Sequence, residues 1–239
     1  MSRDVSSRKV LVTGASSAIG IEVCRQYLSA GHRVAAHFHK NESSLAENFQ
    51  SESRLTRIHC DFSDLEAVSA FAHSHSDADI VVFLSSLARP SSINEIDVQG
   101  WHHSMAIGGL SSFVILGVLG PHMVERGWGR FVIGSSIGVK FGGGEDSFAY
   151  ALSNHTREFI PQAARKWTSS NVFTNVVRIG VTDTDLHKAF PNRNWNQRLK
   201  LIPAQRAAAP REVAEFISWY GSDRNTYVSG QILSISGGE

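Results

Sequence analysis

A short turn near the start of the chain, TGASSAIG at residues 13–20, carries residue types that can bind phosphate. It follows the apolar run KVLV and opens a segment with helical periodicity. Its first glycine permits a tight turn, and its second lets helix and strand pack closely. The first N–H groups of a helix have no partner inside the helix, so they can bind a pyrophosphate. We therefore predict a dinucleotide site, rather than a purely structural turn, at Gly14, Ser16, Ser17, Ile19 and Gly20.

The end of the next apolar segment, AAHFHKNE at residues 35–42, bears on the choice between NAD and NADP. An acid at this place would bind the ribose hydroxyls of NAD and repel the 2′-phosphate of NADP. No acid stands directly at the strand end, and His39 and Lys40 can pair with a phosphate, so NADP is predicted in preference to NAD. Glu42, close to this strand end, leaves binding of NAD as an alternative. Asp61, after the third apolar run, is expected either to contact the adenine amine or to cap its own turn.

Composition limits the classes of partner. The 239 residues are 42% hydrophobic and 19% charged, with a formal net charge of +1, which gives no reason to expect nucleic acid or a membrane. No apolar run is predicted to span a bilayer, and the first residues lack the apolar centre of a signal peptide, so a cytoplasmic protein is expected. The eleven histidines show no HExxH spacing, and Cys24 and Cys60 form no CxxC pair. We predict neither a metal site nor a disulfide.

Short apolar runs alternate with helix-length amphipathic stretches along the whole chain. Strands are predicted at residues 9–14, 33–38, 55–61, 78–86, 129–136, 171–180 and 230–238. Helices are predicted at residues 18–31, 41–50, 63–74, 98–123, from 147 past 164, and 210–222. This alternation predicts one α/β domain over residues 1–239, a Rossmann-type doubly wound parallel sheet of about seven strands with helices on both faces. Ligands of such a sheet bind at the carboxyl ends of its strands.

Several motifs together resemble the short-chain dehydrogenase/reductase family, particularly its 3-oxoacyl-acyl-carrier-protein reductase branch. They are TGASSAIG, the CDFSD turn, Trp101, GRFVIGSSIG, Tyr150, TNVVRIGVTDTD and YVSGQILSISGG, and they cover almost the whole chain. The resemblance implies that Ser136, or Ser135 in another register, polarises a substrate carbonyl with Tyr150. The tyrosine would donate a proton while a nicotinamide delivers hydride. The resemblance also implies cofactor contacts at Ser85, Gly180 and Thr184.

One departure from the family pattern follows Tyr150 by one helical turn. Family members have a lysine there that lowers the pKa of the tyrosine and holds the nicotinamide ribose, whereas this chain has Asn154. Positions i and i+4 share a helix face, so Asn154 should point the same way as Tyr150 and bond a ribose hydroxyl without supplying charge. A cation about 5 Å from a phenolate contributes roughly 3 kcal/mol at an effective dielectric near 20. Its loss is expected to weaken general acid catalysis.

Other charged residues are poorer candidates for the missing cation. Arg157 lies about two turns beyond Tyr150 near the same face, but we expect it to be solvated and too distant. Lys140, in the loop before Tyr150, could reach inward, and His155 should face elsewhere. The remaining departures are Gly108 in place of a helix asparagine, Ser85–Ala88 in place of an Asn-Ala-Gly turn, and Ile179 in place of a proline.

Three functions are compatible with these residues. The favoured one is an NADP-dependent ketoreductase with a modified catalytic tetrad, acting on a 3-oxoacyl or small-metabolite carbonyl. The others are a catalytically silent subunit that binds an active homologue or carrier protein, and a non-redox dehydratase or cyclase on the same fold. The resemblance implies a small-molecule or acyl-carrier-bound substrate and a homo-oligomer (dimer or tetramer) or hetero-oligomer with an active homologue. Residues 186–203 are predicted to form a substrate lid, with Phe190 and Trp195 lining the crevice.

Overall fold

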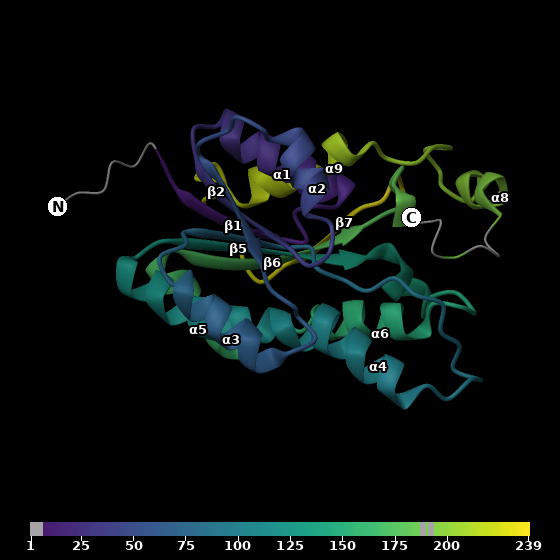
Figure 1. Ribbon diagram of the computed structural model, residues 1–239. Coiled ribbons are helices and arrows are strands. Elements are labelled where there is room, and N and C mark those ends of the chain that lie inside the picture. Colours follow the sequence, from purple (N-terminus) through teal and green to yellow (C-terminus); the bar gives the residue numbers. More distant parts are fainter. Residues whose placement is uncertain (1–6, 187–189, 191–193) are drawn as a thin grey trace.

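One parallel sheet crosses the molecule in the computed structural model, which describes residues 7–186, 190 and 194–239 (Figure 1). Within these residues seven strands lie in the order β3-β2-β1-β4-β5-β6-β7. They are β1 (Lys9–Thr13), β2 (Arg33–Phe38), β3 (Leu55–His59), β4 (Ile80–Phe83), β5 (Gly129–Ser136), β6 (Val172–Ile179) and β7 (Ile232–Ile235). The strand order reverses between β1 and β4, so the carboxyl ends of these strands border a switch point. The predicted doubly wound fold is confirmed.

Helices cover both faces of the sheet (Figure 1). One face carries α1 (Ala18–Ser29), α2 (Glu42–Asn48) and α9 (Pro210–Tyr220). The other carries α3 (Leu65–Ser74), α4 (Val98–Met105), α5 (Ser111–Arg126) and α6 (Phe148–Thr156). Two further helices in the described chain are α7 (Gln162–Lys166) and α8 (Trp195–Lys200). The two faces together bury the sheet between helical layers.

The central strands are apolar on both sides because each side meets a helical layer. In β1, Val10 and Val12 point into the core beneath α1 and α9, whereas Leu11 points into the core beneath α3 and α5. This alternation follows from the two-residue period of a strand. Continuous apolar runs such as IVVF in β4 are therefore typical of a parallel sheet covered on both faces.

α6 and α7 are separate helices, so the prediction of one helix running from residue 147 past Ala164 is wrong. Pro161 has no backbone N–H and disfavours a helical conformation of the residue before it. Both effects favour a helix break close to this point. α6 ends early, and its C-cap residue is Arg157.

The long helix predicted from Val98 continues to Arg126 and contains a π-helical turn, Ala106–Leu110, between α4 and α5. By length and composition this 29-residue segment could cross a membrane, which corrects the expectation that no segment of the chain could. Half of its most apolar window is buried inside the protein, and α5 packs against α3 and β5. The segment is therefore a core helix of this domain.

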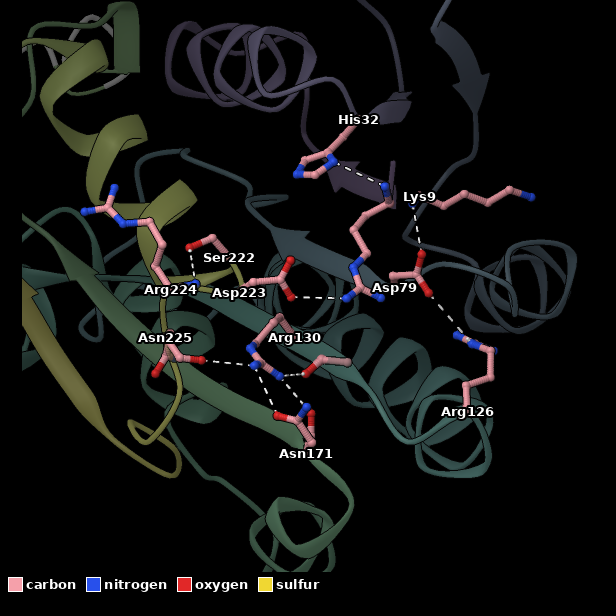
Figure 2. A network of polar contacts seen from close by, with 12 residues as sticks. Lys9, His32, Asp79, Arg126, Arg130, Asn171, Ser222, Asp223, Arg224 and Asn225 are labelled. Carbon is pink, nitrogen blue, oxygen red and sulfur yellow. Dashed lines mark hydrogen bonds and ion pairs between the residues drawn. The ribbon is translucent and has the colours of Figure 1, made fainter. Parts of the chain in front are cut away.

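A polar network around Arg130 holds the amino ends of the central strands (Figure 2). The Arg130 guanidinium donates to the carbonyl oxygens of Asn171 and Asn225, at 2.7 and 3.0 Å. Asp79, just before β4, accepts from the N–H of Lys9 at 3.1 Å. Arg130 is only 2% exposed, and burial lowers its pKa to about 10. Since this network lies where β5 begins, it is remote from the carboxyl ends of the strands.

Candidate active site

A cleft of about 1070 Å³ opens at the carboxyl ends of β1, β4, β5 and β6. Its volume matches that of sites for large organic ligands. Among the predicted site residues, those that line it are Ser16, Ser17, Ile19, Ser136, Tyr150, Asn154, Gly180 and Thr184. The predicted residues outside its lining are Gly14, Gly20, His39, Lys40, Asp61 and Ser85. The structure thus brings the nucleotide turn and the predicted catalytic residues to one cleft.

Close backbone contacts shape the turn between β1 and α1. Gly14 has a φ of +64°, and a Cβ there would lie 3.0 Å from the backbone of Leu84 and Ser85. A Cβ at Gly20 would lie 2.5 Å from the carbonyl oxygen of Gly14, so a larger residue cannot fit at either place. Ser17 caps α1, its Oγ accepting from the N–H of Gly20 at 3.1 Å. The N–H groups of the first two residues of α1 border the cleft and suit an anion.

His37 anchors this turn, a role that the sequence analysis did not assign to it. Its Nδ1 accepts from the N–H of Gly14 at 3.2 Å, and its Nε2 donates to the carbonyl oxygen of Cys60 at 2.9 Å. The ring stacks on Phe62 with 4.0 Å between centroids. Burial lowers the pKa of His37 to about 4, so the neutral ring can keep both bonds at neutral pH. The only sequence signal for this role is a histidine within an apolar strand.

The residues predicted to select NADP lie beside the cleft. Lys40 is exposed at the end of β2, and His39 Nε2 lies 3.6 Å from Asp61 Oδ2. Asp61 Oδ1 accepts from the N–H and the hydroxyl of Ser63 at 2.9 and 2.8 Å, and these hydrogen bonds lower the pKa of Asp61. Asp61 therefore makes the contacts of the turn-capping alternative, and an adenine contact stays a prediction.

Ser136 and Tyr150 stand on two elements that meet at the cleft. Ser136 ends β5, and its Oγ accepts from the N–H of Gly138 at 3.2 Å, which leaves the hydroxyl proton to donate elsewhere. Tyr150 lies in the first turn of α6, and its ring meets the edge of Phe190 with 6.2 Å between centroids. A hydroxyl and a phenol on the wall of one cleft can donate two hydrogen bonds to a substrate oxygen.

The Asn154 amide bonds within the protein, and its predicted contact with a ribose hydroxyl stays a prediction. Its Nδ2 donates to the backbone carbonyl of Tyr150 at 2.8 Å, and its Oδ1 accepts from the guanidinium of Arg157 at 2.7 Å. The expectation that Arg157 is solvated is wrong, because Arg157 is 2% exposed and borders the cleft. It also donates to the carbonyl oxygen of Ser85 at 3.0 Å. These two partners hold the side chain inward, and the Ser85 carbonyl is distant in the sequence.

Ser135 belongs to a buried network that also includes the backbone carbonyl of Asn154, 3.2 Å from the Ser135 hydroxyl. Its hydroxyl donates to Glu158 Oε1 at 2.7 Å. Glu158 accepts two further hydrogen bonds from Arg178, at 2.8 and 2.6 Å. Because Ser135 is bound to a carboxylate, Ser136 is the better placed serine for a substrate.

Two of the other departures from the family pattern lie at close packing contacts or in the cleft wall. Gly108 lies in the π-helical turn, and a Cβ there would be 2.9 Å from Ser153 Oγ, so a larger side chain would require Ser153 to shift. Ile179 and its neighbour Gly180 both line the cleft, and a Cβ at Gly180 would be 2.6 Å from Ser236 Cα. Lys140 is exposed near the ring of Phe141 and is not part of the cleft wall.

The predicted lid, residues 186–203, falls partly outside the described residues. Its described part includes α8, and Trp195 lines the cleft as predicted. Phe190 is buried against Tyr150 rather than in the lining. Arg198 of α8 pairs with Glu239 at 2.6 Å, which ties the helix to the segment after β7.

Comparison with known proteins gives the family. The sequence model described as enoyl-(acyl carrier protein) reductase matches residues 14–239. The 3-oxoacyl-(acyl-carrier-protein) reductase MabA of Mycobacterium tuberculosis is 25% identical over 97% of this chain and 92% of its own length. An acetoacetyl-CoA reductase of an Acinetobacter species is 28% identical over 98% of each chain.

A solved structure gives the same result. It is described as an NAD(P)-dependent gluconate 5-dehydrogenase of Beutenbergia cavernae and superposes with a TM-score of 0.88. It is 25% identical, over 98% of this chain and 96% of its own. The fold, the glycine turn and the family match agree with the resemblance seen in the sequence. This chain belongs to the short-chain dehydrogenase/reductase family, with 3-oxoacyl-acyl-carrier-protein reductases among its relatives.

Proposed function

We propose that this protein is an NADP-dependent ketoreductase that acts on the carbonyl of a 3-oxoacyl or small-metabolite substrate. The observation that carries the proposal is that Ser136 and Tyr150 line the same cleft as the first turn of α1. Two relatives support the substrate class, since one is named a reductase of acetoacetyl-CoA and another a reductase of 3-oxoacyl groups on acyl carrier protein. The carbonyl would be presented on an acyl carrier or as a free small molecule.

Each residue has one task in this reaction. The nicotinamide, when bound, supplies the hydride. Ser136 donates a hydrogen bond to the substrate oxygen, and Tyr150 donates the proton that completes the alcohol. The N–H groups at the start of α1 bind the pyrophosphate. Gly180 and Thr184 line the cleft beyond β6 and would contact the nicotinamide.

NADP is the cofactor we propose, and the adenosine end supports it. Glu42, the acid that left NAD as an alternative, forms an ion pair with Arg57, whose Nε lies 3.3 Å from Glu42 Oε1. Lys40 is exposed next to Asn41, which lines the cleft, and so stands near the place of a 2′-phosphate. The similar structure from Beutenbergia cavernae is described with bound NADP at low occupancy.

Calorimetric titration with NADPH and NADH, followed by NADPH oxidation with a panel of 3-oxoacyl thioesters and small ketones, tests the proposal. We expect tighter binding of NADPH and turnover of at least one carbonyl. Lys40→Glu should weaken NADPH binding by about three- to tenfold, because it reverses the charge near the phosphate, and leave NADH binding within about twofold. Lys140→Glu is the control for a charge reversal outside this region.

Two outcomes would replace the proposal. Tight NADPH binding without turnover of any carbonyl would favour a silent subunit that binds an active homologue or carrier protein. Turnover without any nicotinamide would favour a dehydratase or cyclase.

A further inference from the structure

Arg157 is a buried cation at the place where the family pattern loses one. The family lysine would stand at position 154, where Asn154 is neutral and 1% exposed. Both polar groups of the Asn154 amide are engaged, the Nδ2 with the Tyr150 carbonyl and the Oδ1 with Arg157. Asn154 therefore positions the guanidinium.

The guanidinium of Arg157 is held by two hydrogen bonds and keeps a further N–H donor without a partner among the described residues. Its Nη2 donates to Asn154 at 2.7 Å, and its Nη1 donates to the Ser85 carbonyl at 3.0 Å. The group lies 5.4 Å from the Phe83 ring centroid, and its buried Nε has no hydrogen-bond partner among the described residues. Arg157, Asn154 and Tyr150 border the same cleft. An arginine that only tied α6 to β4 would not need to border the cleft.

The charge of Arg157 is not cancelled by a neighbouring acid. The adjacent carboxylate, Glu158, is bonded to Arg178 and Ser135 instead. In the described part of the chain, no carboxylate forms an ion pair with Arg157. Burial lowers the pKa of Arg157 to about 10, and the charges of Tyr150 and Glu158 oppose that shift, so the group is a cation at neutral pH. A buried cation that is hydrogen-bonded but has no ion-pair partner is costly, and such groups are often found at functional sites.

Other charged groups that border the cleft are Asp185, Arg198 and Glu239, and the last two pair with each other. Lys140 is exposed outside the lining. Arg157 is thus the cleft cation at the C-cap of α6, and its guanidinium bonds Asn154, which lies one turn after Tyr150 on that helix.

We propose that Arg157 replaces the family lysine as the cation that stabilises the ionised form of Tyr150, and that Asn154 holds it in place. The family cation lies four residues after the tyrosine, whereas here it lies seven residues after it. Asn154 offers Arg157 a hydrogen-bond acceptor, whereas a lysine at position 154 would repel the guanidinium. Arg157 is a positioning residue that acts through Tyr150. This inference rests on the proposed function, but its central measurement needs neither cofactor nor substrate.

The ionisation of the Tyr150 phenol can be measured by phenolate absorbance in protein without cofactor. Of the four tyrosines, Tyr27 and Tyr220 are buried, and burial raises the pKa of Tyr27 and raises that of Tyr220 to about 12. Tyr227 is 93% exposed, and Tyr227→Phe removes its signal. In that background, the phenolate signal that Tyr150→Phe abolishes is the signal of Tyr150.

Arg157→Met should move this ionisation up by about one pH unit, because a cation is lost in a medium of intermediate dielectric. Arg157→Lys keeps the charge and should leave the ionisation within about 0.3 pH unit. The matched control is Arg130→Met, which removes an equally buried arginine at the far end of β5 and should not move the ionisation. If Arg157→Met does not fold, Arg157→Gln replaces it, since glutamine keeps a donor for the Ser85 carbonyl.

A double-variant cycle tests whether a cation at position 154 can replace the cation at position 157. Asn154→Lys in the Arg157→Met background should return the ionisation to within about 0.3 pH unit of the parent value. The same change with Arg157 present should lower the melting temperature, because two cations would be forced together in a buried site.

An ionisation unmoved by both neutral variants of Arg157 would overturn the inference and leave Arg157 as a structural tie. A shifted ionisation in a protein that reduces no carbonyl would support the inference and contradict the proposed function. The two failures are thus distinguishable.

Discussion

At the scale of single residues, the site depends on side chains whose partners are far away in the sequence. Ser136 and Tyr150 could be assigned from sequence because they sit in recognisable motifs. The inward position of Arg157 could not, because it depends on the carbonyl of Ser85, in the segment after β4. The role of His37 depends likewise on Gly14 and on the carbonyl of Cys60.

Because of His37, the free energy of unfolding should decrease as the pH falls. Its pKa falls from 6.5 to about 4 on folding, so the unfolded chain binds a proton first as pH decreases. The neutral His37 ring contributes its full stabilisation of the folded state above pH 6.5, and this contribution is lost progressively down to about pH 4. The loss amounts to roughly 3 kcal/mol.

Urea unfolding at several pH values between 7 and 4 measures this loss. His37→Asn is uncharged at every pH and can still accept from Gly14, so its curve should be flatter by most of that amount. His39→Asn, at a partly exposed position nearby, is the control and should follow the wild type. Parallel curves for wild type and His37→Asn would contradict this assignment.

At the scale of elements, apolar patterns located all seven strands and nearly every helix of the described chain. β2 and β5 have the predicted boundaries because their apolar runs end at turn residues. The break between α6 and α7 was missed because periodicity continues across it, although Pro161 was visible. The π-helical turn was also missed, since it depends on close packing between two helices rather than on local preference.

Because the π-helical turn lies close to α6, alanine substitution should affect stability differently at two glycines of the long helix. Gly108→Ala should destabilise by about 1–3 kcal/mol, because its Cβ would meet Ser153 Oγ at 2.9 Å and Cβ at 3.2 Å. Gly117→Ala should be neutral or stabilising by up to about 1 kcal/mol, since nothing lies within 4 Å of its Cβ. Melting temperatures by circular dichroism compare them. Equal effects at the two positions would show that α6 does not pack as described.

At the scale of the whole molecule, the π-helical turn before α5 and the segment after α6 present apolar side chains to solvent. Leu110 is 42% exposed and Phe159 is 69% exposed, with the ring of Phe159 centred 6.4 Å from that of Phe113. A patch of exposed apolar side chains is typical of an interface between protein chains. We therefore expect a dimer or tetramer that uses this face.

Light scattering coupled to size-exclusion chromatography measures the mass. The wild type should elute as an oligomer, and Leu110→Glu with Phe159→Glu should give protomers, because two carboxylates would be buried in the interface. Tyr227→Glu, at a fully exposed position outside this face, should keep the wild-type mass. A monomeric wild type at micromolar concentration would refute this assembly.

The central claim is that Tyr150 supplies the proton when a carbonyl is reduced beside a nicotinamide. The most direct measurement is NADPH oxidation with the preferred 3-oxoacyl thioester or ketone, for the wild type and Tyr150→Phe. We predict that kcat/KM falls by about 100-fold or more in Tyr150→Phe, while the NADPH dissociation constant stays within about twofold. A Tyr150→Phe protein that turns over as fast as the wild type would contradict the account.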